Sequence, residues 1–124
     1  MTPPDDIQVM VCPAVPGNPR NSEAAIVVLR DGTLLLAYSR FHGGTDDDAA
    51  ADIAGKTSSD GGRTWGEPFV IQPNNGQQNV MEVNMLRLKS GRIGRSSFGC
   101  WRLKRRASPC GPAIFPARAG AGRR

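Results

Sequence analysis

The side chains of this 124-residue chain that could do chemistry include a cluster in the segment "HGGTDDDAA". Three consecutive aspartates, Asp46, Asp47 and Asp48, follow His42, the one histidine of the sequence. Carboxylates and an imidazole are the usual groups for proton transfer and for binding substrate hydroxyls. Glycine and aspartate also favour solvated turns, so a polar loop without a catalytic role is the alternative.

A further aspartate, Asp60, lies in the segment Ser58–Trp65, "SSDGGRTW". Asp60 is able to accept hydrogen bonds from nearby backbone N–H groups, while the glycines are free to adopt positive φ. The hydroxyls of Ser58 and Thr64 satisfy further backbone groups, and the indole of Trp65 packs the turn onto a sheet. We therefore expect a structural turn whose carboxylate serves its own backbone rather than catalysis or a metal.

The elements that position these segments are expected to be strands. Four apolar runs predict them, at about 25–29, 34–41, 51–58 and 65–71. Asp31 and Gly32 between the first two runs favour a β-hairpin. Pro68 marks the fourth run as an edge strand, because proline cannot donate to a ladder.

The hairpin pattern recurs later in the chain. The segments "VVLRDGTL" and "LRLKSGRI" both pair two apolar runs about a glycine, and Gly32 and Gly91 are 59 residues apart. Residues 77–85 are expected to form the strand that leads into the second copy. Four-stranded antiparallel units repeated on this scale predict an all-β fold of the β-propeller type, with a generic β-sandwich as the alternative.

The turn also matches the Asp-box pattern S-x-D-x-G-x-T-W, whose fixed positions are Ser58, Asp60, Gly62, Thr64 and Trp65. Together with the preceding hairpin and acidic loop, residues of about 18 to 94 resemble the first blade and the opening of the second in bacterial sialidases (neuraminidases) and related BNR-repeat proteins. The resemblance implies a six-bladed propeller, of which about one and a half blades are present here. It also implies a retaining glycoside hydrolase that removes terminal sialic acid, or a related acidic sugar, from glycoconjugates.

The same resemblance assigns roles to individual residues. Arg20 corresponds to the first of three arginines that bind the substrate carboxylate. Asp48, and after it Asp47, corresponds to the general acid/base. Further substrate-binding positions are Glu23, His42 and Asn79. The other arginines and the Tyr/Glu nucleophile pair would lie in later blades, so we expect this chain to be inactive by itself, without cofactor or metal. A non-catalytic Asp-box module that binds glycan or protein is the alternative function.

Charge divides the chain unevenly. Residues 1–93 carry eight Lys/Arg against eleven acids, whereas residues 94–124 carry eight Lys/Arg and no acid. We therefore predict an extended lead-in (1–21), the blade region (22–93) and a basic, low-complexity tail (94–124) that is disordered or out of reading frame. A solvated tail and a polyanion-binding arm are the alternatives, although a nucleic-acid partner is not expected.

The cysteines and the amino-terminal residues exclude several classes. Three cysteines without a CxxC spacing predict neither a disulfide framework nor a zinc site. The start "MTPPDDIQVMVCP" has two acids and no long apolar core, which is atypical of a signal peptide, and no run reaches transmembrane length. A cytoplasmic location without a membrane partner is the default expectation.

Overall fold

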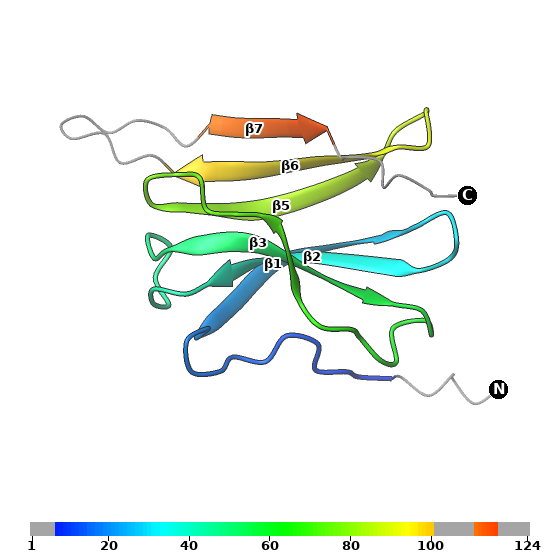
Figure 1. Ribbon diagram of the computed structural model, residues 1–124, viewed down its shortest axis with the longest axis horizontal. Coiled ribbons are helices and arrows are strands. Elements are labelled where there is room, and N and C mark those ends of the chain that lie inside the picture. The colour runs from blue at the N-terminus through cyan, green and yellow to red at the C-terminus, as the bar shows by residue number, and fades with distance from the viewer. Residues whose placement is uncertain (1–6, 101–110, 117–124) are drawn as a thin grey trace.

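The computed structural model of the protein describes residues 7–100 and 111–116 (Figure 1). The described residues form antiparallel strands and no helix, which confirms the all-β class. The strands make two sheets, a first with the order β1-β2-β3-β4 and a second with the order β5-β6-β7. Figure 1 shows the second sheet lying over the first, with the amino-terminal segment on the opposite side.

The first two strands, β1 (Arg20–Val28) and β2 (Leu34–Phe41), form the predicted hairpin. Gly32 has a φ of 86°, a conformation that favours glycine. Asp31 Oδ1 accepts a hydrogen bond from Thr33 N at 2.9 Å, which closes the turn. The bounds of β2 are those predicted, whereas β1 begins earlier than its apolar run because its polar first half also pairs with β2.

The sheet continues through β3 (Ala51–Ser58), which pairs with β2 along its whole length and has the predicted bounds. β4 (Phe69–Gln72) lies at the edge of the sheet, as Pro68 predicts. The strand is shorter than the predicted 65–71, because Trp65 belongs to the preceding turn and proline cannot join the ladder.

The second sheet consists of β5 (Asn79–Arg87), β6 (Ile93–Cys100) and β7 (Gly111–Pro116). β6 crosses the boundary predicted at residue 94, so the segment predicted to be disordered or out of frame begins inside a strand, and that segment also includes β7. A prediction from amino-acid composition neglects the backbone, whose N–H and C=O groups in β5 pair with a neighbouring segment whatever its side chains are. The rest of the predicted tail, 101–110 and 117–124, lies outside the described residues.

The two hairpins are structural copies of each other with an offset of 59 residues. β1 and β5 have the same length, and each contains a register shift at a residue with positive φ, Glu23 (52°) or Glu82 (57°). Both turns are closed by the same pair of backbone hydrogen bonds. The recurrence predicted from Gly32 and Gly91 is therefore present in the fold.

Each sheet has two faces, which we call forward and rear. The forward face of the first sheet is turned toward the second sheet, and the forward face of the second sheet is turned away from the first. The forward face of the first sheet packs on the second sheet through a buried cluster of Ala37, Ile53, Val80 and Val83. Its rear face buries Leu36, Tyr38 and Ala54 beneath Val11, Cys12 and Trp65. Burial raises the pKa of the Tyr38 phenol to about 12, in agreement with a packing role.

Candidate functional site

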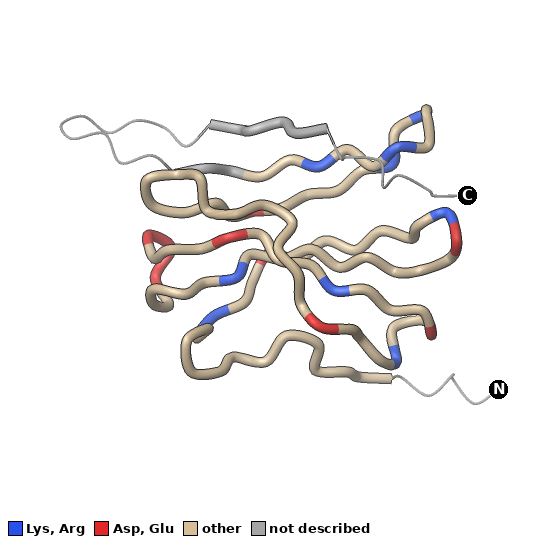
Figure 2. Tube along the Cα trace, viewed as in Figure 1, with Lys and Arg blue, Asp and Glu red and all other residues tan. Residues whose placement is uncertain are grey.

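Charged residues are concentrated along the chain where β1 begins, β2 ends and β3 begins (Figure 2). The loop 42–50 joins β2 to β3 at this end and carries the three aspartates. The first residue of β5 also contacts this loop. Four strand ends and one loop therefore meet around Arg20, which the sequence analysis predicts to bind a substrate carboxylate.

Arg20 is held by several groups at once. Its Nη1 donates to Thr45 O at 2.8 Å and to Asp47 Oδ1 at 2.7 Å, and its Nη2 lies 3.8 Å from Glu23 Oε1. The guanidinium lies over the ring of Phe41, 4.4 Å from the centroid. About a quarter of the side chain, 26%, remains exposed. The position of Arg20 is therefore fixed by these contacts, and its side chain is still partly exposed to solvent.

The aspartates of the loop differ in their surroundings. The Asp47 carboxylate contacts Arg20 and is 80% exposed. Asp48 is tied to the rest of the protein by its backbone, since its carbonyl oxygen accepts from Gln78 Nε2 at 2.9 Å. The Asp48 carboxylate has no hydrogen bond or ion pair with any described residue. The structure thus brings Asp47 to Arg20, whereas the sequence ranks Asp48 first.

The side chain of Asn79 binds the backbone of the loop 42–50. This side chain is fully buried, and Nδ2 donates to Asp47 O at 2.6 Å and to Ala49 O at 3.1 Å. Its Oδ1 is buried without a partner among the described residues. Asn79 is therefore placed to position the loop, whereas the sequence predicts that it binds substrate.

Glu23 lies at the junction of the two sheets. Its Oε2 accepts from Ser39 Oγ at 2.8 Å and from Glu82 N at 3.3 Å. Ser39 Oγ accepts from the same amide at 3.0 Å. Positive φ is uncommon for a residue with a side chain, so the bulge at Glu23 is a specific feature of the fold. The carboxylate joins Arg20 to the sheet-to-sheet contact.

His42 lies apart from this cluster. Its Nε2 is 3.2 Å from Asp52 Oδ1, and Arg40 binds the same carboxylate through two hydrogen bonds of 2.9 and 2.7 Å. The bond to Asp52 raises the pKa of the Arg40 guanidinium. Alternation along β2 places Arg40 on the rear face, with Tyr38, and Phe41 on the forward face.

Arg40 and Asp52 were not selected from the sequence. They are direct cross-strand neighbours in the pairing of β2 with β3. The signal was available only through the register of that pair, since both residues lie in runs that otherwise look apolar. They form a bidentate ion pair that is 18% and 10% exposed.

The turn at the other end of β3 has the contacts expected of a local clasp. Asp60 Oδ1 accepts from Ser58 Oγ at 2.8 Å and from Thr64 N at 2.9 Å, and Oδ2 accepts from Thr64 Oγ1 at 2.5 Å. The bonds from Thr64, followed by that from Ser58, hold the pKa of the Asp60 carboxyl well below its ordinary value. Gly62 has a φ of 91°, and its carbonyl oxygen accepts from Trp65 Nε1 at 2.9 Å.

The described part of the chain contains no cluster of three or more His, Cys, Asp or Glu side chains suited to a metal ion. It also contains no helix with the length and apolar character needed to cross a membrane. Comparison with known proteins found no matching family model and no matching curated protein.

Proposed function

We propose that this chain supplies the first blade and part of the second in a sialidase-like propeller, and that its Arg20 and Asp47 belong to a site for the terminal acidic sugar of a glycoconjugate. The observation that carries the proposal is the pairing of a fixed, partly exposed guanidinium with a highly exposed carboxylate. Two structural copies of one hairpin, with sheets packed face to face, support the propeller architecture.

The chemistry of the pair suits such a sugar. A guanidinium binds a carboxylate through parallel hydrogen bonds, which is a geometry that few other side chains offer. A neighbouring carboxyl group that is open to solvent is able to deliver a proton to a leaving oxygen. In this proposal Arg20 binds the sugar carboxylate and Asp47, rather than Asp48, is the proton donor.

Two of the groups that contact Arg20, Asp47 and Glu23, are acids, so an incoming carboxylate must replace one of them. Asp47 is the partner that a ligand would displace, because it is exposed and lies on a loop, whereas Glu23 is tied to Ser39 and to the second sheet. We expect the chain alone to bind the sugar weakly and without turnover, since the nucleophile of a retaining mechanism would come from other blades.

Titration of the full chain with N-acetylneuraminic acid, followed by NMR of the arginine side-chain N–H groups, tests the proposal. The Arg20 signal should move in a saturable manner, and N-acetylmannosamine, a sugar without the carboxylate, should leave it unchanged. Arg20→Ala should abolish binding, while Arg63→Ala, an exposed arginine of the turn, should preserve it. Equal shifts with both sugars, or binding that survives Arg20→Ala, would contradict the proposal.

A non-catalytic module that binds glycan or protein is the second candidate. It is favoured by the turn at Asp60, whose contacts clasp a hairpin and need no active site nearby. Binding of neutral glycans that is indifferent to Arg20 would support this candidate instead.

A further inference from the structure

The forward face of the second sheet carries exposed apolar side chains. Leu86 is 68% exposed, and Leu88, just beyond the strand, is 45% exposed. Leu86 lies opposite Gly94 of β6, on the face away from Met85, which packs against the core between the sheets. One repeat earlier, the equivalent positions are Val27 and Leu29, which are half-buried. The second sheet therefore presents the face that the first sheet uses for packing.

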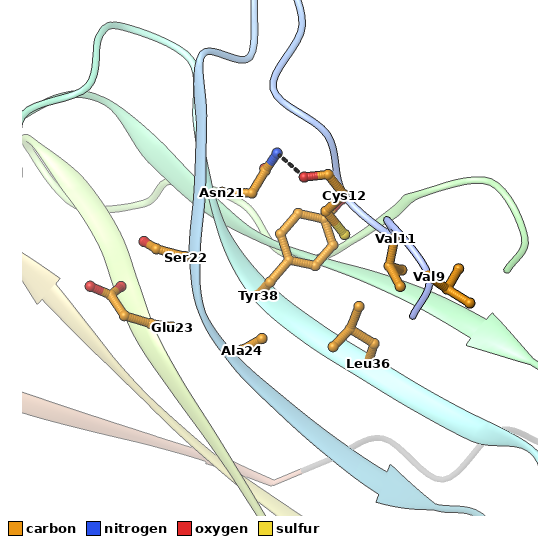
Figure 3. A pocket seen from close by; sticks show the side chains of 9 residues that line it. All are labelled: Val9, Val11, Cys12, Asn21, Ser22, Glu23, Ala24, Leu36 and Tyr38. Carbon is orange, nitrogen blue, oxygen red and sulfur yellow. Dashed lines mark hydrogen bonds between the residues drawn. The ribbon is translucent and has the colours of Figure 1, made fainter. Parts of the chain in front are cut away.

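The rear face of the first sheet has the complementary character. Ile26 and Val28 are 58% and 53% exposed, and they lie opposite Leu36 and Leu34 on that face. Beside them is a hollow of about 280 Å³ between β1 and the amino-terminal segment (Figure 3). The residues that line the hollow include Val9 and Val11 of the amino-terminal segment, Asn21 and Ala24 of β1, and Leu36 and Tyr38 of β2.

On the rear face of the second sheet, the region equivalent to this hollow is filled by packing against the first sheet. Asn21 and Ala24 correspond to Val80 and Val83, which are only 2% and 3% exposed. Those two residues are covered because the forward face of the first sheet packs against them. On the rear face of the first sheet, the amino-terminal segment covers the corresponding region only in part.

The two bulges differ in the same way, because the carboxylate of one has a partner inside the chain and the carboxylate of the other does not. Within the chain, the carboxylate of Glu23 accepts from the bulge amide of Glu82. Glu82 occupies the equivalent bulge, and its exposed side chain has no hydrogen bond or ion pair with the described residues. The bulge at Glu23 borders the hollow, and Figure 3 shows the Glu23 side chain on the opposite side of β1 from Tyr38.

We propose that the forward face of the second sheet binds the rear face of the first sheet in another copy of this chain. The contact would repeat the one inside the chain, with Leu86 and Leu88 against Ile26 and Val28. The Glu82 carboxylate would accept from the bulge amide next to the hollow. A second copy is the occupant because it carries a face with the matching strands, bulge and apolar positions. The interface is heterologous, so copies associate head to tail.

Sedimentation velocity of the full chain at rising concentration tests this association. The average mass should exceed that of one chain, and it should fall to one chain for Leu86→Asp and for Ile26→Asp. Val15→Asp introduces the same charge at an exposed apolar residue of the amino-terminal segment and should leave the mass unchanged. Glu82→Gln should weaken association several-fold, while Glu67→Gln should not.

Mixing the two aspartate variants gives a sharper test that does not depend on either variant alone. Ile26→Asp keeps its forward face and Leu86→Asp keeps its rear face, so an equimolar mixture should form two-chain complexes and nothing larger. Circular dichroism of each variant reports its fold. A chain that stays single at every concentration, variants that still associate separately, or a mixture that stays at the single-chain mass would overturn the proposal.

The outcome is separable from that of the sugar titration. Arg20 lies at the end of the first sheet near the loop 42–50, whereas Leu86 and Ile26 lie toward the hairpin turns. Leu86→Asp should therefore abolish association without moving the Arg20 response to N-acetylneuraminic acid.

Discussion

The two ends of β3 carry two loops of similar composition and different construction. At one end, the Asp60 carboxylate receives its hydrogen bonds from Ser58 and Thr64, all within four residues. At the other end, the Asp47 carboxylate accepts a hydrogen bond from Arg20, which is 27 residues away in the chain, and it is 80% exposed. Both segments combine aspartate with glycine, so composition alone does not distinguish them.

The difference lies in where the partners come from. A turn that satisfies its own carboxylate forms from local sequence and leaves few lone pairs for a ligand. The loop 42–50 instead depends on remote groups, because Asn79, the first residue of β5, and Gln78, just before that strand, bind its backbone. The geometry of this loop therefore depends on contacts with distant residues, and the Asp47 carboxylate remains largely accessible to solvent. The loop is therefore the better candidate for binding and the turn the better candidate for stability.

Replacing Ser58 should have the largest effect on stability. Ser58 is 2% exposed, and its Oγ both donates to Asp60 and accepts from Gly62 N. Ser58→Ala leaves both groups without that partner, so the free energy of unfolding should fall by about 1–3 kcal/mol. Urea denaturation measures the change. The adjacent, exposed Ser59→Ala should stay within about 0.5 kcal/mol, and equal losses for both variants would contradict a local clasp.

Asn79→Ala should cost less and act on the other loop. It removes two hydrogen bonds to the loop backbone, but it also removes the unpartnered Oδ1, so the loss should be about 1 kcal/mol. Hydrogen exchange should accelerate at the amides of the loop 42–50 and not in the turn 58–65. Gln78→Ala, which removes one exposed bond to Asp48 O, is the milder control. Faster exchange in both loops would show that they are not independent.

Sequence predicted the local parts of this molecule well. The runs 34–41 and 51–58 became strands with the predicted bounds, and the Asp31-Gly32 pair and Pro68 marked a hairpin and an edge strand. Each of these signals depends on a few neighbouring residues. The same locality explains why the pattern around Asp60 predicted the backbone hydrogen bond from Thr64 N to its carboxylate. The hydroxyls of Ser58 and Thr64, expected to serve backbone groups, both donate to that carboxylate.

The contacts between distant residues were harder to predict. Distance along the chain favours Asp48 over Asp47 as the acid, whereas the contact with Arg20 depends on how the loop folds back. Asn79 was expected to face a ligand, although its burial follows from the packing of the second sheet on the first. Arg40 and Asp52 were missed because their pairing requires the register of two strands.

The pH dependence of stability should report on the Asp60 carboxylate. The Asp60 carboxyl has a folded-state pKa below its ordinary value of 3.8, so it stabilises the fold above that pH. That contribution is lost as the pH falls below 3.8 toward the lower folded-state value. Carboxyl NMR titration should place the Asp60 midpoint below the ordinary range, and Thr64→Val should raise it. A midpoint unaffected by Thr64→Val would contradict the role given to that hydroxyl.

The smallest effect on stability should come from Asp47→Asn, and this variant sharpens the comparison most for function. An exposed ion pair contributes at most about 1 kcal/mol, so unfolding should barely change. If a ligand carboxylate displaces Asp47 from Arg20, neutralising Asp47 removes the competitor, and N-acetylneuraminic acid should bind several-fold more tightly. Asp48→Asn should not alter the affinity as strongly, because its carboxylate does not contact the guanidinium. Weaker binding by Asp47→Asn would mean that this carboxylate orients Arg20 for the ligand instead of competing with it.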